Sequence, residues 1–492
     1  MKRTGILFLA FAALSAMGNL SAKVVLPTHF TDNMVLQQNR ILTLKGTASP
    51  RNTVTLTTGW GKEAQAEADW LGHFTMQIET PKASNKPYEL VFDDGETTRL
   101  QNVLVGEVWL GSGQSNMEMP LEGWGKVLNY KEEIQNANYP KIRLLQVKKV
   151  VSYEPQEQVQ LNMGGWQECS PEYVANFSAL CYFYALRLWE ELQIPIGVID
   201  NDWGGTPAEA WVSREALACV TGIGEMMQKY KELGYDGKAI DSYIKGSKTV
   251  WANLAQSNHP SVLYNAMIHP LIDFPIKGVI WYQGCSNVGR SEQHTPLFQT
   301  LIHDWRRLFK QPEMPFYFVQ LANFLAPSNL QPESQWALLR ESQSKALCMP
   351  HTGMAVNIDL GDPKDIHPKT KRELGRRLSA IALNRTYGKH IPYTAPIYKD
   401  YIVVGREVYL QFDMPEGSEP LVQGDNQPGF IIQGPDLKWH VAQARTIAAD
   451  KVVVASPDVQ YPIAVRYGWA DNPTCTLKTA SGLHVAPFRT DK

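Results

Sequence analysis

The chain contains 492 residues, and at about 150 residues per domain this length predicts about three domains. Hydrophobic residues make up 44% and charged residues 20%, an ordinary globular composition that excludes a disordered chain. The 47 Lys and Arg residues nearly balance the 49 Asp and Glu residues, so the formal net charge of −2 provides no basic field for nucleic acid.

The first 22 residues have the pattern of an export signal. Lys2 and Arg3 precede an apolar run at 5–17, and small residues follow up to Ala22. Cleavage after Ala16 and cleavage after Ala22 both fit this pattern. No later apolar run reaches the ~18 residues that a membrane-spanning helix needs. We therefore expect a periplasmic or extracellular protein that has no membrane span once the signal is removed.

Residues 23–102 predict a small β-sandwich. The segments 64–70 and 74–78 alternate between apolar and polar side chains with a period of two, as half-buried strands do. Turn signals such as Asp94-Gly95 separate several short segments of this kind. Closely spaced strands with no intervening helical pattern are typical of two packed antiparallel sheets.

The next residues, 103–391, predict a catalytic α/β domain with a parallel sheet and helices on both faces. Near-continuous apolar segments indicate strands buried on both faces, and they lie at 103–110, 142–147, 196–199, 278–282, 316–321 and 354–358. Helical patterns separate them, for example one in which Leu374, Leu378 and Ile381 share a face. Residues 221–259 interrupt the alternation and predict an insertion near the site. Helical patterns stop at residue 392, so residues 392–492 predict a β-rich C-terminal domain.

The sequence indicates no cofactor and no metal centre. Its six cysteines include no Cys-x-x-Cys pair, and its eleven histidines include no His-Glu-x-x-His motif. Cysteines this sparse also predict no disulfide scaffold.

Chemically active residue types follow four of the predicted strands. Ser115 lies in GSGQSNM after the strand at 103–110, and the Gly204-Gly205 pair follows the strand at 196–199. Asn287 follows the strand at 278–282, and His367 follows the strand at 354–358. Ligands of an open α/β sheet bind beyond the carboxyl ends of its strands, so we expect these residues to lie close together.

Such residues are what acyl transfer requires. A serine hydroxyl needs a base to become a nucleophile, and His367 is the candidate base. The oxyanion of a tetrahedral intermediate needs fixed hydrogen-bond donors, for which the Ser115 N–H, a glycine N–H and the Asn287 amide are candidates.

Four ordered blocks resemble those of SGNH-type hydrolases: GQSNM at 113–117, WGGTP at 203–207, WYQG at 281–284 with Asn287, and DIHP at 365–368. More narrowly, the sequence is similar to the sialate O-acetylesterase family of secreted carbohydrate esterases. The segments NMVLQ at 33–37 and VGEVW at 105–109 extend the resemblance over nearly the whole mature chain.

The resemblance implies an SGNH, flavodoxin-like catalytic domain that hydrolyses O-acetyl esters of sialic acids. It implies Ser115 as the nucleophile and His367 as the general base and acid. It also implies that Gly205 and Asn287 join the Ser115 N–H in the oxyanion hole. The expected partner is therefore an O-acetylated sugar, while the oligomeric state is not indicated.

The sequence departs from the family pattern at two positions. Cys285 stands where family members often have Glu, so the support of Asn287 is expected to differ; we interpret Cys285 as a packing residue rather than a second nucleophile. Lys364 stands three residues before His367, where many SGNH hydrolases have Asp. Asp365, Asp362 or a backbone carbonyl could orient the imidazole instead, and we favour Asp365.

Three functions compete at this point. The first is a secreted serine esterase for O-acetylated sialic acids, and the second is an acetylxylan or other polysaccharide O-acetylesterase. The third is a catalytically silent carbohydrate-binding protein. Sialic acid carries a carboxylate that xylan lacks, and Arg214 and Arg290 are candidate cations for it, although each is also typical of a surface ion pair.

Overall fold

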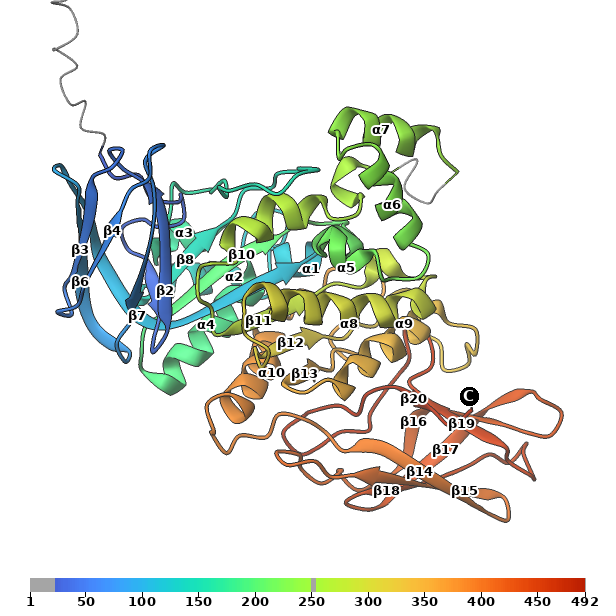
Figure 1. Ribbon diagram of the computed structural model, residues 1–492. Coiled ribbons are helices and arrows are strands. Elements are labelled where there is room, and N and C mark those ends of the chain that lie inside the picture. Colours follow the sequence, from blue (N-terminus) through green and yellow to red (C-terminus); the bar gives the residue numbers. More distant parts are fainter. Residues whose placement is uncertain (1–22, 249–253, 492) are drawn as a thin grey trace, which may run out of the picture.

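The computed structural model describes residues 23–248 and 254–491. The predicted export signal at 1–22 lies outside the described residues. Among the helices formed by the described residues, none is both long and apolar enough to cross a membrane. Figure 1 shows strands at the N-terminal end, a central sheet surrounded by helices, and a second strand-rich region at the C-terminal end.

The N-terminal strands form two sheets around one core. The strands are β1 (Val35–Gln37), β2 (Ile41–Thr47), β3 (Thr53–Thr58), β4 (Glu63–Glu67), β5 (His73–Glu79), β6 (Ser84–Asp93) and β7 (Thr97–Gly113). β2 pairs with β5, whereas β3 pairs with β4 and β6, and β6 pairs with β7. Alternate side chains of β2 and β3, such as Leu42, Leu44, Val54 and Leu56, are fully buried between the two sheets.

Strand β7 continues from this region into the central sheet. Its first residues alternate in exposure, but from Val103 to Gly113 every residue is buried. It pairs with β6 between Thr97 and Val105, and with β10 from Glu107 onwards. The strand thus begins six residues before the predicted 103–110 segment, and the expected boundary between residues 102 and 103 lies inside one continuous strand.

The central sheet is largely parallel. Besides β7 it contains β8 (Tyr139–Gln146), β9 (Gln167–Cys169), β10 (Ile196–Asp202), β11 (Gly278–Tyr282), β12 (Phe316–Val319) and β13 (Thr352–Ala355). The spatial order is β13-β12-β11-β7-β10-β8-β9. The predicted parallel sheet is confirmed for β8, β10, β7, β11, β12 and β13, whereas the short edge strand β9 runs antiparallel to β8. Numbered along the chain, the six parallel strands lie in the spatial order 2-3-1-4-5-6, so the first strand, β7, is the point at which the strand order reverses.

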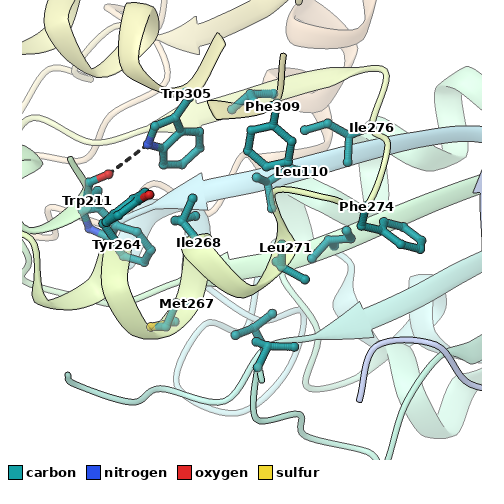
Figure 2. Close-up of a cluster of buried hydrophobic side chains, with 14 of the residues drawn as sticks. Leu110, Trp211, Tyr264, Met267, Ile268, Leu271, Phe274, Ile276, Trp305 and Phe309 are labelled. Atoms are coloured by element: carbon teal, nitrogen blue, oxygen red, sulfur yellow. Dashed lines mark hydrogen bonds between the residues drawn. The ribbon is translucent and has the colours of Figure 1, made fainter. Parts of the chain in front are cut away.

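Helices cover both faces of this sheet. The long ones are α4 (Ala179–Leu192), α8 (Ser291–Leu308), α9 (Gln335–Ser344) and α10 (Lys371–Arg385). Val279 and Trp281 of β11 share a core with α8, whereas Ile280 and Tyr282 share another core with α4 and α10. Successive strand side chains point to opposite faces, so a strand buried on both sides supplies two cores. Figure 2 shows part of the first core, in which Trp305 Nε1 donates a 2.9 Å hydrogen bond to Trp211 O.

Further helices connect these elements. The α-helices among them are α1 (Ser115–Glu118), α2 (Tyr130–Asn136), α3 (Pro171–Val174), α5 (Arg214–Leu217), α6 (Gly224–Glu232) and α7 (Gly237–Gly246). The others are the 3₁₀ helices η1 (Ala208–Trp211), η2 (Gln256–Asn258), η4 (His269–Leu271), η5 (Cys285–Asn287) and η6 (Lys345–Cys348), and the π-helix η3 (Tyr264–Ile268). Residues 221–259, the predicted insertion, contain α6, α7 and η2. Figure 1 shows α7 at the top of the view, away from both strand-rich regions.

The C-terminal region is a seven-stranded antiparallel sheet, which confirms the predicted β-rich character. Its strands are β14 (Ile397–Val404), β15 (Glu407–Asp413), β16 (Gly424–Gln433), β17 (Trp439–Ala448), β18 (Lys451–Ala455), β19 (Ala464–Tyr467) and β20 (Phe488–Arg489). The buried guanidinium of Arg340 in α9 donates to the carbonyls of Ala470 and Asp471 at 2.7 and 2.9 Å. The same guanidinium donates to Leu321 and Ala322, so it links this region to the central sheet.

Candidate active site

Ser115 begins α1 immediately beyond the carboxyl end of β7. The turn before it needs glycine at position 113, where φ is +141° and a Cβ would lie 2.2 Å from the carbonyl oxygen of Tyr282. The Gln114 Oε1 accepts a 3.0 Å hydrogen bond from the Gly284 N–H. The segments that follow β7 and β11 are therefore fixed to each other at the point where the strand order reverses.

His367 lies on the loop between β13 and α10 and contacts Ser115. Its Nε2 is 2.9 Å from Ser115 Oγ, and its Nδ1 is 3.2 Å from Asp365 Oδ1. The same Asp365 oxygen accepts a 2.9 Å hydrogen bond from the His367 backbone N–H, which holds the carboxylate beside the ring. Asp362 instead accepts from the Lys364 N–H. Of the candidate orienting carboxylates, the structure places Asp365 beside the imidazole.

The imidazole of His367 is half-buried between charged groups. Burial lowers its pKa below the ordinary value, and the neighbouring Asp365 carboxylate opposes this effect. The cation of Lys371 lowers the pKa further. A depressed pKa keeps the imidazole neutral at pH 7, which is the form that accepts a proton from a serine hydroxyl.

Asn287 is held in one orientation beyond the carboxyl end of β11. Its Oδ1 accepts hydrogen bonds from the Ala208 N–H at 3.0 Å and from Gln283 Nε2 at 2.7 Å. Its Nδ2 donates to Glu209 Oε2 at 3.0 Å, and the other oxygen of this buried carboxylate pairs with Arg290. Two donors on the amide oxygen determine which end of the amide is the nitrogen. Among the residues that the structure describes, Glu209 is the acceptor of Nδ2, so one of the two Nδ2 hydrogens is left for another acceptor.

Asn287 is hydrogen-bonded to a carboxylate although Cys285 stands where family members often have Glu. Glu209 of η1 provides this carboxylate. No sequence pattern indicated this contact, because Glu209 and Asn287 are 78 residues apart along the chain. Burial raises the pKa of the Cys285 thiol to about 12, so it is protonated at neutral pH. This agrees with its interpretation as a packing residue.

The Gly204-Gly205 pair faces Ser115 from the loop after β10. A Cβ at position 204 would lie 3.2 Å from the Cβ of Ser115. The Gly204 N–H donates a 2.5 Å hydrogen bond to Glu118 Oε2. Gly205 is exposed, with φ at +77° and open space where a Cβ would be. Because Gly204 is engaged by Glu118, Gly205 is the member of the pair whose N–H is available to a bound group.

Lys371 was not among the predicted site residues, and its side chain is fully buried. Its Nζ donates a 2.6 Å hydrogen bond to Asn116 Oδ1, and Asn116 Nδ2 donates to the carbonyl of Ile366 at 3.0 Å. Burial lowers the pKa of Lys371 to about 7. A signal was present, because position 371 is in helical phase with Leu374 and Leu378 on the buried face of α10.

Trp124 was also missed. Its ring meets that of His367 edge-on at a centroid distance of 5.1 Å, yet the residue is 51% exposed. A tryptophan between two glycines on a loop gives no sequence signal of its own.

The two arginines considered for a substrate carboxylate are already engaged. Arg290 pairs with Glu209 at 2.6 Å. Arg214 pairs with Glu154 and Glu215 and stacks over the ring of Tyr235 at 3.8 Å.

Comparison with known proteins gives matches over nearly the whole chain. Human sialate O-acetylesterase is 29% identical, and the match covers 94% of this chain and 91% of the human protein. The rat sialate O-acetylesterase is 30% identical, with 93% and 91% covered. The crystal structure of a carbohydrate acetylesterase from Xanthomonas citri is 36% identical and superposes with a TM-score of 0.82, covering 95% of this chain and all of that one.

These relationships define the protein as a carbohydrate esterase, an enzyme that hydrolyses O-acetyl esters. The family model described as carbohydrate esterase, sialic acid-specific acetylesterase, matches residues 105–384, and the chain belongs to that family. The matched residues run from within β7 to the last turn of α10, and they include all of the site residues described above.

Proposed function

We propose that the protein is an exported SGNH-type serine esterase that removes O-acetyl groups from sialic acids through an acetyl-enzyme. One observation carries the mechanism: His367 Nε2 lies 2.9 Å from Ser115 Oγ while Nδ1 faces Asp365 at 3.2 Å. This geometry supports a nucleophile, a general base and an orienting carboxylate in the order that acyl transfer requires.

In the first half-reaction, His367 Nε2 takes the proton of the Ser115 hydroxyl as Oγ attacks the acetyl carbonyl carbon. Asp365 accepts the Nδ1–H, which selects the tautomer with a free Nε2 and stabilises the imidazolium that forms. The tetrahedral intermediate collapses when the C–O bond to the sugar breaks. His367 returns the proton to the departing sugar oxygen, and the acetyl group remains on Ser115.

Three donors would stabilise the negative oxygen of the intermediate: the backbone N–H groups of Ser115 and Gly205 and the second Nδ2 hydrogen of Asn287. The contacts of Asn287 with Ala208, Gln283 and Glu209 fix its amide before substrate binds. Donors that are already oriented cost no reorganisation in the transition state, which is why such sites accelerate acyl transfer.

In the second half-reaction, His367 removes a proton from water as the water oxygen attacks the acetyl-enzyme. The second tetrahedral intermediate expels Ser115 Oγ, which regains its proton from His367, and acetate is released. The depressed pKa of His367 suits this role, because the base is regenerated in its neutral form at neutral pH.

The substrate follows from the relatives named sialate O-acetylesterase and from the family description. A second candidate, esters of a neutral polysaccharide such as acetylated xylan, is favoured by the 36% identical relative that is named only a carbohydrate acetylesterase. Export rests on the residues 1–22 and on no described part of the fold.

The decisive experiment measures acetate release from O-acetylated sialic acids and from acetylated xylo-oligosaccharides, for the mature wild type and for the variants Ser115→Ala and His367→Ala. We expect the highest kcat/KM on a sialic acid ester, and a loss of orders of magnitude in both variants. Both variants should retain the fold, because Ser115 is the half-buried first residue of the short helix α1 and His367 lies half-buried on a loop. Near-wild-type turnover in either variant would reject the mechanism. Turnover of p-nitrophenyl acetate that survives in Ser115→Ala would show that Ser115 is not the nucleophile.

A further inference from the structure

A hollow of about 380 Å³ lies beyond the carboxyl ends of β8 and β10. Gln146 ends β8, Asp200 and Asp202 end β10, and these strands are adjacent in the sheet. Ligands of open α/β sheets bind at this edge. The position therefore agrees with a ligand site.

The hollow adjoins the catalytic residues through two of its lining side chains. Glu118, one of its lining residues, belongs to the same short helix as Ser115 and accepts the Gly204 N–H. Trp124, another lining residue, touches His367 edge-on. A molecule in the hollow would thus lie beside the Ser115–His367 pair.

The chemistry of the wall is that of a sugar site. The half-exposed Trp124 offers a flat apolar surface, on which the C–H face of a pyranose ring can stack. Around it lie the side-chain amides of Gln146, Asn162 and Asn176. Gln146 and Asn162 are hydrogen-bonded to each other, whereas the described part of the chain gives the exposed Asn176 amide no partner. Amides provide both donors and acceptors, as sugar hydroxyl groups require.

Charge around the hollow is nearly balanced. Glu118 pairs with Lys149 at 2.6 Å. Asp200 and Asp202 are buried beside each other, and burial together with their mutual repulsion raises the pKa of Asp202. A volume of about 380 Å³ is at the lower end for small-molecule sites, so it suits one sugar ring rather than a chain.

We propose that this hollow binds the sugar ring that carries the acetyl ester, with Trp124 as its stacking surface and Asn176 as a hydrogen-bonding residue. The proposal rests on the proposed function, since it assigns the place of the sugar at the same catalytic site. The sugar ring would stack on the Trp124 ring, and its acetyl group would point past His367 towards Ser115.

The test compares two substrates and two tryptophans. Trp124→Ala should raise KM for an O-acetylated sialic acid by about tenfold or more, which corresponds to 1.4 kcal/mol per tenfold. Any loss in kcat/KM for p-nitrophenyl acetate, which reports the contact of Trp124 with His367, should be at least about fivefold smaller than the loss for the sugar ester, because p-nitrophenyl acetate has no sugar ring. Trp70→Ala, which removes a 71% exposed tryptophan on the turn between β4 and β5, is the matched control and should change neither.

Equal losses on both substrates would overturn the proposal, because Trp124 would then act only by supporting His367. An unchanged KM for the sugar ester would overturn it as well. Asn176→Ala, which leaves the tryptophan in place, should also raise KM for the sugar ester only. If Ser115→Ala retains activity, the mechanism fails, but the substrate-dependent effect of Trp124→Ala still decides where the sugar binds.

Binding can also be measured without turnover. Calorimetry should detect the binding of intact O-acetylated sialic acid to the inactive Ser115→Ala variant. The additional change Trp124→Ala should weaken this binding about tenfold or more. Equal affinity of the two variants would contradict the assignment.

Discussion

The ammonium group of Lys371 and the side-chain amide of Asn116 join two segments that are 255 residues apart in the chain, through a buried 2.6 Å hydrogen bond. Asn116 follows the proposed nucleophile, and through its Nδ2 it also binds the carbonyl that precedes His367. These two contacts lie directly behind the Ser115–His367 hydrogen bond. They hold together the segments that this bond must align.

Replacing Lys371 by Met removes a cation that lowers the pKa of His367. The pKa of His367 should therefore rise, and the acid limb of the kcat/KM profile should move to higher pH, because the enzyme needs neutral imidazole. The exposed neighbour Arg372 provides the control: Arg372→Met should not move the profile. An acid limb that moves to lower pH, or not at all, would contradict this role.

The same substitution should change how stability depends on pH. Lys371 has a pKa of about 7 in the folded protein and about 10.4 when unfolded, so between these values the unfolded chain binds more protons. This lysine therefore makes the folded state more stable as pH rises from about 7 to about 10. Urea unfolding of wild type and Lys371→Met should be measured at pH 7 and pH 9. From pH 7 to pH 9, the free energy of unfolding of the wild type should increase relative to that of the variant. A constant difference would be inconsistent with a depressed pKa.

Asp365→Asn should lower kcat by about a thousandfold or more, because an amide favours the wrong imidazole tautomer. Loss of the carboxylate also removes a group that raises the pKa of His367, so the acid limb of any residual activity should move to lower pH. Asp362→Asn serves as the control and should have a mild effect. A loss of less than about tenfold in Asp365→Asn would leave a Ser115–His367 dyad with no essential third member.

Asn287→Ala should reduce kcat by about 10²–10³ with little change in KM, as expected for one oxyanion donor. Glu209→Gln keeps the size of the side chain but weakens its hydrogen bond to the Asn287 amide. This variant should therefore also lower kcat, but by less than Asn287→Ala does. Steady-state kinetics on the sugar ester distinguish this from a binding defect. If KM rises while kcat is retained in Asn287→Ala, the residue binds substrate rather than the oxyanion.

Lys148 and Lys149 are exposed cations that line the hollow together with Trp124. Lys149 pairs with Glu118, whereas the part of the chain that the structure describes offers Lys148 no ion pair. Lys148→Gln should raise KM for a sialic acid ester up to about fivefold at physiological salt, the range of an exposed charge pair. KM for a neutral acetylated xylo-oligosaccharide should not change. Equal effects on both substrates would show that Lys148 does not contact the sugar carboxylate.

The elements of the central sheet could be predicted from the sequence because its strands are buried on both faces. The apolar run at 278–282 coincides with β11, whereas the run at 354–358 is shifted from β13, which ends at Ala355. The antiparallel edge strand β9 has three residues and no apolar run, so no periodicity indicated it. Its place depends on pairing with β8, which is a contact between distant residues.

Some residues of the candidate active site could likewise be predicted from the sequence, and others could not. Ser115, His367 and Asp365 could be found because they lie in short local motifs after strands. Glu209 and Trp124 could not, because each acts on a residue from another part of the chain. The helical phase of Lys371 indicated that it is buried, but not that it contacts Asn116. Glu209 reaches Asn287 across 78 residues, and only the folded sheet brings the two together.

The continuity of β7 has a mechanical consequence for the whole enzyme. One end of this strand is an edge partner of β6, and the other end delivers Ser115. A flexible linker would let the N-terminal sheets swing freely, but an unbroken, hydrogen-bonded strand transmits displacement along its length. The same strand therefore sets the register of the N-terminal sheets and the position of Ser115, and no linker separates the two.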